Sequence, residues 1–525
     1  MRMVRAPVRF LAILLSIASA SAQPPDYDIL ITNGRVLDGS GNPWFAADVA
    51  ISADRIVAVG PLAGAKATRV IDAAGLVVAP GFIDVHSHAA EGLGGPLNTA
   101  VPLLAQGITT VFINPDGGGP TDLDAQRTTL ERKGVGVNVS QFVPHGSIRG
   151  AVLGMADRAP SVEELARMAA LVRAGMKAGG LGLSSGLYYA PGSYAKTEEV
   201  IALAKVAAEF GGVYSSHIRD EADYSIGVVA AVQEVIRIAD EAHLPGVVSH
   251  MKALGPAQWG LSVALTTRIE QARARGVQVY ADQYPYEASG TGLSAALVPR
   301  WAQVGGHDEF LKRLAGTDRA RIKGAIVENL ARRGGPDTLV ISDYAPDHAL
   351  EGKSLAAIAA ERRLAAVDLA VALLEKGDGG LVSFNMSERD IAHIMRQTWT
   401  MTCTDGDLSA PGQGKPHPRG YGAFARKLGV YVREREVVGL ADAVRSMTSL
   451  PAQVFGLMDR GVIRRGARAD LVVFDPATVR DVATYASPQQ LAEGMRFVLV
   501  NGVATIADGK ATSATPGRAL RPERR

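Results

Sequence analysis

The chain contains almost no cysteine and shows no strong excess of charge of either sign. Cys403 is the single cysteine among 525 residues, so no disulfide can form within the chain, even in an oxidising compartment. The 55 lysine and arginine residues nearly balance the 53 aspartate and glutamate residues, which leaves a formal net charge of +2. That balance argues against bulk electrostatic capture of nucleic acid, and we expect no nucleic-acid partner.

Long apolar runs are also scarce. The run at 10–15 follows three arginines and precedes the small-residue site at 20–22, which is the pattern of a cleaved secretory signal. It is too short to span a bilayer, and no later stretch approaches the ~20 apolar residues that a spanning helix requires. We therefore predict a signal peptide at 1–22, a periplasmic or secreted protein, and no membrane partner after cleavage. An uncleaved membrane anchor is the alternative.

The composition is that of a folded globular protein, with 47% hydrophobic and 21% charged residues. Short apolar runs separated by glycine, asparagine and proline fill 23–79 and return at 456–515, which indicates strands joined by tight turns. We expect these two segments to pair into one small β-sandwich. The basic end of the chain, 516–525, is expected to form a frayed tail.

Between these ends, strand-like apolar runs alternate with helix-like stretches, which predicts an α/β fold with a parallel sheet or barrel. Eight such runs can be identified, and eight is the strand number of a (β/α)8 TIM-like barrel. We place this barrel at 80–455, with a helical insertion at about 298–345, because more than a hundred residues separate the last two runs. The runs are 82–88, 109–116, 137–145, 180–185, 212–217, 246–250, 277–284 and 398–405.

Histidines stand at the carboxyl ends of several of these runs. His86 and His88 are two residues apart on an extended strand, so both imidazoles can face one metal ion, although such a pair alone also fits a structural or surface role. His217 and His250 each end a further run, and four imidazoles could therefore converge at the mouth of the barrel. His145 ends another run, and we expect a hydrogen-bonding role for it.

A carboxylate closes the last run. Asp405 would lie beside a metal bound by the four histidines, where a carboxylate can take a proton from water and later deliver it to a leaving group. Asp405 is therefore the candidate catalytic residue. The alternative is a strand-end or helix-capping aspartate.

These residues lie within longer motifs through which the chain resembles the amidohydrolase superfamily, and more narrowly the D-aminoacylase group, the N-acyl-D-amino-acid deacylases. The resemblance covers nearly the whole mature chain, and its most specific motif is 182–195, which begins Gly182-Leu183-Ser184-Ser185-Gly186-Leu187-Tyr188-Tyr189. Further matching motifs are 33–39, 216–221, 249–253, 282–286 and 469–475.

The resemblance implies metal-dependent hydrolysis of the amide bond of small-molecule N-acyl-D-amino acids, giving a carboxylate and a free D-amino acid. It implies one or two Zn2+ ions, with His217 and His250 at the principal position and His86 and His88 at a second. Asp405 would then act as general base and later as acid. A set of three side chains would hold the α-carboxylate of the substrate: Tyr189, Lys252 and Arg419.

One position departs from the family pattern. Where that pattern reads Gly-Asn-Cys-Gly and supplies a cysteine ligand, this chain reads Asn114-Pro115-Asp116-Gly117. A carboxylate is a competent zinc ligand and can bridge two ions, so we expect Asp116 to bind metal and to let Mn2+ or Co2+ replace Zn2+. The alternative is that Asp116 only forms a turn.

The sequence gives only a weak indication of which D-amino acid side chain the protein prefers. The loop 287–296 contains no arginine that could meet an acidic side chain, which favours neutral or hydrophobic D-amino acids. Another exported amidohydrolase, such as a dipeptidase or cyclic amidase, and a catalytically inactive peptide-binding barrel are the alternative functions. The sequence makes no prediction of oligomeric state.

Overall fold

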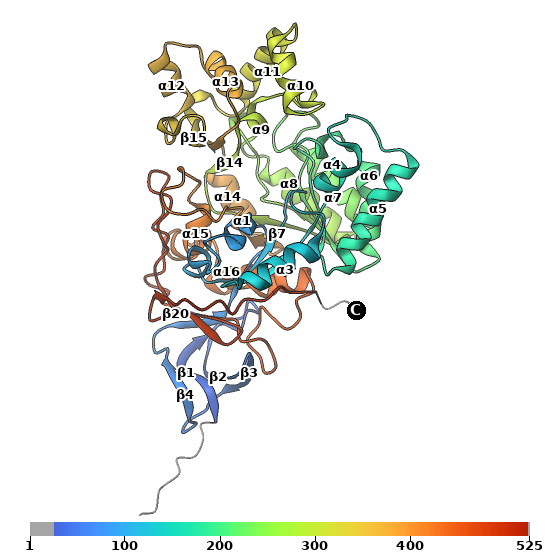
Figure 1. The fold of residues 1–525 in the computed structure, drawn as a ribbon. Helices are drawn as coiled ribbons and strands as arrows, with labels where there is room; N and C mark the ends of the chain where they lie inside the picture. The colour runs from blue at the N-terminus through green and yellow to red at the C-terminus, as the bar shows by residue number, and fades with distance from the viewer. Residues whose placement is uncertain (1–25, 523–525) are drawn as a thin grey trace, which may run out of the picture.

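The computed structural model describes residues 26–522, and the predicted signal peptide lies outside them. A β-rich domain made from both chain ends, a barrel and an insertion follow one another along the molecule (Figure 1). None of the described helices combines the length and apolarity needed to cross a bilayer.

Eight parallel strands form the barrel and coincide with the eight predicted runs. In two sheets they follow the orders β6-β7-β8 and β9-β10-β11-β12-β13-β17, and β8 and β9 are one strand interrupted at Phe142. The Phe142 N–H joins the sheets by donating to the Ile113 carbonyl, and at the other seam the Asp405 N–H donates to the His86 carbonyl over 2.9 Å. The barrel is therefore closed. Its strands are β6 (Phe82–Asp84), β7 (Ile108–Ile113), β8 (Asn138–Gln141), β9 (Val143–Pro144), β10 (Gly182–Gly186), β11 (Val213–His217), β12 (Gly246–Val248), β13 (Val279–Gln283) and β17 (Thr400–Thr402).

Helices pack around the barrel because each presents one apolar face to the strands. Helix α5, for example, starts with a capping box in which Ser161 and Glu164 satisfy each other's backbone N–H groups, and it buries Met168, Val172 and Met176. The helices are α1 (Ala90–Gly94), α2 (Val101–Leu104), α3 (Leu123–Lys133), α4 (His145–Leu153), α5 (Val162–Lys177), α6 (Thr197–Ala208), α7 (Val228–Ala242), α8 (Ser262–Ala274), α14 (Glu388–Met395), α15 (Arg419–Arg426), α16 (Leu440–Met447) and α17 (Ser449–Val454).

The two chain ends meet in one nine-stranded sheet, because β5 pairs antiparallel with β18. Side chains alternate across this pairing: Val78 and Val473 face the core of the β-rich domain, whereas Val77 and Phe474 face the barrel core. The sheet folds back on itself, so that its opposite parts enclose one core as in a sandwich. Its strands are β1 (Tyr27–Val36), β2 (Phe45–Ser52), β3 (Arg55–Gly60), β4 (Ala67–Asp72), β5 (Val77–Pro80), β18 (Leu471–Phe474), β19 (Met495–Val500), β20 (Val503–Ala507) and β21 (Lys510–Ala511).

The insertion is wider and less purely helical than predicted. It runs from β14 (Ala288–Gly292) to β16 (Gly380–Phe384), beyond both ends of the predicted range 298–345, and a three-stranded antiparallel sheet in the order β14-β16-β15 forms its base. Strand β14 reads Ala-Ser-Gly-Thr-Gly, which carries little strand signal. The remaining elements, which enclose a separate apolar core, are α9 (Leu293–Leu297), α10 (His307–Ala315), α11 (Arg319–Arg332), β15 (Leu339–Asp343), α12 (Leu355–Arg362) and α13 (Ala366–Leu374).

The expectation of a frayed tail at 516–525 is wrong for the described part. The Leu520 N–H donates to the Val139 carbonyl over 2.7 Å, and the Val139 N–H donates to the Arg518 carbonyl over 2.9 Å. Val139 belongs to β8, so the end of the chain supplies hydrogen bonds to the outer edge of a barrel strand.

Candidate metal centre

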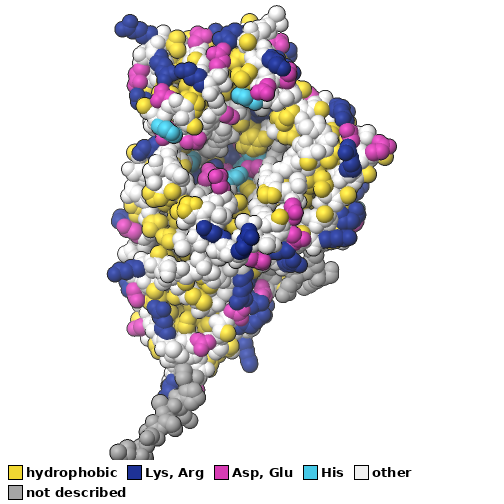
Figure 2. Space-filling view, in the orientation of Figure 1, with side chains coloured by type: hydrophobic (Ala, Val, Ile, Leu, Met, Phe, Trp, Pro, Cys, Tyr) yellow, Lys and Arg dark blue, Asp and Glu magenta, His cyan; other side chains and the backbone are white. Residues whose placement is uncertain are grey.

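A cavity of about 1170 Å³ opens between the insertion and the carboxyl ends of the barrel strands. Figure 2 shows this hollow below the insertion, with histidine and acidic side chains visible inside it. This is the end of a parallel barrel at which reacting groups gather.

Four histidines reach the floor of the cavity from three strands. His86 and His88 follow β6, His217 ends β11, and His250 follows β12. The ring centroids of His86 and His250 lie 4.9 Å apart, and those of His217 and His250 lie 4.5 Å apart. The predicted convergence of imidazoles is therefore present in the structure.

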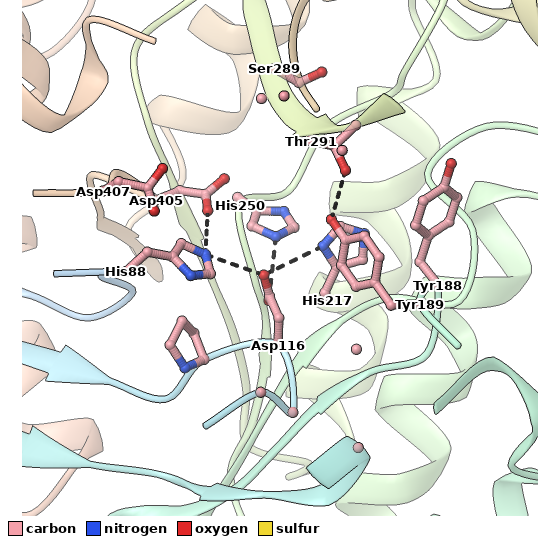
Figure 3. A pocket seen from close by; sticks show the side chains of 18 of the residues that line it. His88, Asp116, Tyr188, Tyr189, His217, His250, Ser289, Thr291, Asp405 and Asp407 are labelled. Atoms are coloured by element: carbon pink, nitrogen blue, oxygen red, sulfur yellow. Dashed lines mark hydrogen bonds and ion pairs between the residues drawn. The ribbon is translucent and has the colours of Figure 1, made fainter. Parts of the chain in front are cut away.

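Asp116 lies at the centre of these rings (Figure 3). Its Oδ1 is 3.3 Å from His86 Nε2 and 3.7 Å from His250 Nε2, while its Oδ2 is 3.5 Å from His88 Nε2 and 3.9 Å from His217 Nδ1. Each carboxylate oxygen thus faces two histidines, as a bridging ligand would.

Asp405 approaches the same group from β17. Its Oδ1 is 3.4 Å from His86 Nε2 and 3.2 Å from His88 Nε2, and its Oδ2 accepts a hydrogen bond from Arg419 Nη1 over 2.6 Å. Ligand atoms of His86, Asp116, His250 and Asp405 all lie within 4.8 Å of one another. The site therefore has a compact set of nitrogen and oxygen donors.

Several of these donor atoms have no hydrogen-bond partner although they are buried. Both ring nitrogens of His86, both of His217, and Asp116 Oδ1 are in this condition. Leaving buried polar atoms unsatisfied is costly unless something else binds them. A metal ion could bind Asp116 Oδ1 and one nitrogen of a neighbouring ring, so the residues present fit such an ion.

The backbone around the site is held in an unusual conformation. Asp116, His250 and Asp405 have φ angles of 55°, 34° and 48°, which non-glycine residues seldom adopt. The Asp282 carboxylate accepts the His250 N–H over 2.7 Å and so supports the turn after β12. Strain concentrated at converging polar side chains is typical of functional sites.

The electrostatics of the site also suit a divalent cation. Burial acts to raise the pKa of Asp116, but the charge of His86 and contact with His250 hold it well below its usual range. Burial acts in the same direction on Asp405, but the charges of Arg419 and His250 hold its pKa far below the usual range. Burial lowers the pKa of His217 to about 3. Burial acts to lower the pKa of His250, but the charge of Asp405 and contacts with Asp116 and Glu221 raise it to about 9. The site thus offers ionised carboxylates and one neutral imidazole, and a bound metal would have to displace the proton of His250.

Glu221 is a site residue that the sequence analysis did not identify. Its Oε1 lies 3.1 Å from His250 Nδ1 and 4.0 Å from His217 Nε2, and it pairs with the ammonium group of Lys252. The signal was its position in the motif 216–221, four residues after His217. Glu221 can orient His250 or join His217 as a ligand.

The three predicted carboxylate-binding residues all line the cavity. Tyr189 contacts the His217 ring, with centroids 4.6 Å apart, and shares a 3.3 Å hydrogen bond with Thr291. Tyr284 packs against both Lys252 and Arg419, with its ring centroid 5.6 Å from Lys252 Nζ and 4.8 Å from Arg419 Cζ.

Two further histidines serve structural hydrogen bonds. His145 Nε2 lies 3.0 Å from a Glu199 carboxylate oxygen, in line with the role expected for it. His417, which sequence reasoning missed, accepts the Arg419 N–H at Nδ1 over 3.1 Å and donates from Nε2 to the Ala288 carbonyl over 2.9 Å. His417 thereby links α15, which begins at Arg419, to the first strand of the insertion.

Comparisons with known proteins agree with this arrangement. The chain is 37% identical to an N-acyl-D-glutamate deacylase of Alcaligenes xylosoxydans xylosoxydans, over 94% of this chain and 96% of that protein. It is 35% identical to a D-aminoacylase of the same organism, over 96% and 99%. A solved structure of N-acyl-D-glutamate deacylase from Bordetella bronchiseptica, complexed with zinc and a phosphonate inhibitor, matches with a TM-score of 0.81 and 35% identity, covering 94% of this chain and 99% of that one.

The model of the amidohydrolase family matches residues 69–510, which include every residue of the site described above. Together with the two full-length relatives, this match means that the chain belongs to the amidohydrolase family and, within it, to the D-aminoacylase group.

Proposed function

We propose that the protein hydrolyses the amide bond of N-acyl-D-amino acids, giving a carboxylate and a free D-amino acid. The observation that carries this proposal is the convergence of four imidazoles and two carboxylates, with donor atoms left unpartnered, at the mouth of a closed barrel. The names of the relatives support it, since they include a D-aminoacylase and an N-acyl-D-glutamate deacylase.

Two overlapping groups of residues would hold one or two Zn2+ ions. His86, Asp116, His250 and Asp405 form one group, and His217, Glu221 and His250 form the other. When bound, such an ion polarises the substrate carbonyl and lowers the pKa of a water molecule. Because several donors are carboxylates rather than thiolates, Mn2+ or Co2+ would also suit the site.

Asp405 is the proton carrier in this proposal. Its Oδ2 is fixed by Arg419, so its Oδ1 points to His86 and His88, where the water and the scissile amide would meet. The ionised carboxylate accepts a proton from the attacking water. As the carbon–nitrogen bond breaks, it gives that proton to the leaving amine, so the product is a free amino group.

Arg419 and Lys252 both line the cavity, and Arg419 pairs with this carboxylate. Arg419 Nε has no hydrogen-bond partner, so a donor remains for the substrate's α-carboxylate, and Tyr189 bounds the cavity beside His217. With the α-carboxylate held at one point and the amide at another, the side chain of one enantiomer points into the cavity and that of the other into protein. We therefore expect strong discrimination between enantiomers.

The direct test is a hydrolysis screen of paired N-acetyl-D and N-acetyl-L amino acids with zinc added. We expect turnover of the D compounds at least roughly 100-fold above that of the L compounds. Hydrolysis of dipeptides or cyclic amides in place of these substrates would favour the other amidohydrolase activities. Metal-free protein without turnover would favour a peptide-binding barrel.

We also propose export from the cytoplasm, which rests on the composition of 1–22. N-terminal sequencing of protein recovered from the periplasm or medium should begin at Gln23. Recovery of the chain with Met1 in the cytosolic fraction would contradict export.

A further inference from the structure

Three cationic side chains line the cavity, and two of them already face a carboxylate. Lys252 pairs with Glu221, and Arg419 pairs with Asp405. The third is Arg333, which follows α11 in the insertion. Within residues 26–522, no acidic side chain forms an ion pair with Arg333 at 4.0 Å or less, whereas the other two lining cations each have such a partner.

Arg333 is also deeply buried, with 2% of its surface exposed. Its three nitrogens donate to hydroxyl groups: Nε to Tyr224 over 2.8 Å, Nη2 to Tyr188 over 3.2 Å, and Nη1 to Ser383 over 3.4 Å. Hydroxyl groups satisfy the N–H donors but do not neutralise the charge. A buried cation without a counter-ion is unfavourable, and such charges in proteins are normally paired.

A second arginine, which does not itself line the cavity, adds positive charge beside Tyr188. The Arg300 guanidinium lies 3.9 Å from the centroid of the Tyr188 ring, and its own hydrogen bonds go to backbone carbonyls. Burial acts to raise the pKa of Tyr188, but the charges of Arg300 and Arg333 bring it below its ordinary value. This wall of the cavity is therefore electropositive.

Tyr188 also connects this wall to the candidate metal centre. Its ring centroid lies 5.4 Å from that of His217, while its hydroxyl contacts Arg333. Figure 3 shows Tyr188 beside Tyr189 and His217 at the edge of the site. A substrate with its amide at the histidines could thus extend its side chain along Tyr188 toward Arg333.

Among the acidic side chains that line the cavity, Asp116 lies among the histidines, and Glu221 and Asp405 already pair with Lys252 and Arg419. The other acidic lining residues are exposed. These are Glu91, Asp343, Asp378 and Asp407. Water and salt screen exposed charges, so they contribute little to the choice of ligand compared with a buried charge. The buried guanidinium is therefore the stronger determinant.

We propose that Arg333 binds a second carboxylate, carried by the side chain of the substrate, so that the preferred substrates are N-acyl derivatives of dicarboxylic D-amino acids. This inference rests on the proposed deacylase function. It replaces the expectation of neutral or hydrophobic side chains drawn from the loop 287–296, because the cation comes from the residue that follows α11 instead.

The test compares each acid with its isosteric amide. For the wild-type protein, kcat/KM for N-acetyl-D-glutamate over N-acetyl-D-glutamine, or for the aspartate–asparagine pair, should be at least roughly 10. Arg333→Gln should abolish this preference while keeping hydrolysis of the amide substrates within about 3-fold. Arg333→Lys should keep part of the preference. Arg332→Gln is the matched control, because the neighbouring Arg332 pairs with Asp223 and does not line the cavity.

Equal rates for acid and amide in both pairs would overturn the inference. An equal fall in kcat/KM for every substrate in a folded Arg333→Gln variant would also overturn it, because that result would make Arg333 a structural residue. If no N-acyl-D-amino acid is hydrolysed, the proposed function fails separately. In that case, calorimetry can compare the affinities of N-acetyl-D-glutamate and N-acetyl-D-glutamine for the zinc-loaded wild type and for Arg333→Lys. The difference in affinity decides whether the cavity selects a second carboxylate.

Discussion

Asp116 shows how much of the site depends on one side chain. Its two oxygens face four histidines, and its backbone has a φ of 55°, which places the carboxylate over the barrel axis rather than along β7. A harder oxygen donor stands here where the family pattern has a soft thiolate, which reduces selectivity for zinc over manganese or cobalt.

Replacing Asp116 distinguishes a ligand from a turn residue. Asp116→Ala should lose metal and activity together. Asp116→Asn should also bind metal at least roughly 10-fold more weakly, although asparagine tolerates this backbone conformation well. Metal analysis of both purified variants, read beside kcat, provides the measurement. Full metal content and a normal rate in the Asn variant would mean that Asp116 only forms a turn and is not a metal ligand.

Asp405→Asn tests the proton carrier. The amide keeps the size of the carboxylate but cannot accept a proton, so kcat should fall by ~100-fold or more. Metal should remain bound, because the other members of its ligand group, His86, Asp116 and His250, are unchanged. A rate close to that of the wild type would show that another group carries the proton.

The site residues that could be predicted are those tied to a strand end. His86, His217, His250 and Asp405 follow apolar runs, so the barrel's symmetry alone brings them together. Glu221, His417 and Arg333 could not be found this way, because they come from loops and the insertion, where no periodic pattern relates sequence position to the cavity.

At the scale of elements, β10 is packed so closely against the site that it requires glycine. A Cβ on Gly186 would lie 2.3 Å from the Asp116 carbonyl oxygen, and one on Gly182 would lie 1.8 Å from the Val213 carbonyl oxygen. The glycines in the motif 182–195 are therefore explained by backbone packing.

Gly186→Ala should consequently displace the turn that carries Asp116. We expect a loss of stability of about 1–3 kcal/mol, together with weaker metal binding and lower kcat. Gly324→Ala, in α11, is the matched control, because a Cβ there meets nothing within 4 Å. That change should raise stability by about 0.5–1 kcal/mol. Urea denaturation and metal titration of both variants test this, and unchanged metal affinity in Gly186→Ala would contradict it.

Elements with strong periodic signals were predictable, and weak ones were not. All eight barrel strands coincide with apolar runs, whereas β14 and β16 were missed because glycines lie within them and beside them. The docked tail was missed for another reason: its hydrogen bonds satisfy the edge of β8, a need that arises only after the barrel has formed.

On the scale of the whole molecule, the candidate ligands cross-link the barrel. They come from the ends of β6, β7, β11, β12 and β17, so a bound ion would hold both halves of the ring together. The insertion lies over the same end (Figure 1), and among residues 26–522 its apolar cluster contains only its own residues.

Metal removal should therefore lower thermal stability. An ion present at 100 times its dissociation constant stabilises the folded state by about 2.7 kcal/mol. Treatment with a chelator should lower Tm by several degrees, and added Zn2+ should restore it. Asp116→Ala should show little response to either treatment. The same Tm for wild-type protein with and without chelator would mean that no ion contributes to the folded state.

The pairing of β5 with β18 can form only late in synthesis, because the two strands lie at opposite ends of the sequence. Val77 pairs with Phe474 and Pro80 with Leu471, so one partner is synthesised before the barrel and the other after it. At roughly 5–20 residues per second, translation of the residues between β5 and β18 takes on the order of tens of seconds, and β5 lacks this partner strand for that time. Throughout that interval an apolar strand offers unpaired N–H and C=O groups to other nascent chains. Aggregation should therefore threaten the growing chain far more than the finished protein, and slower translation should lengthen the period of risk.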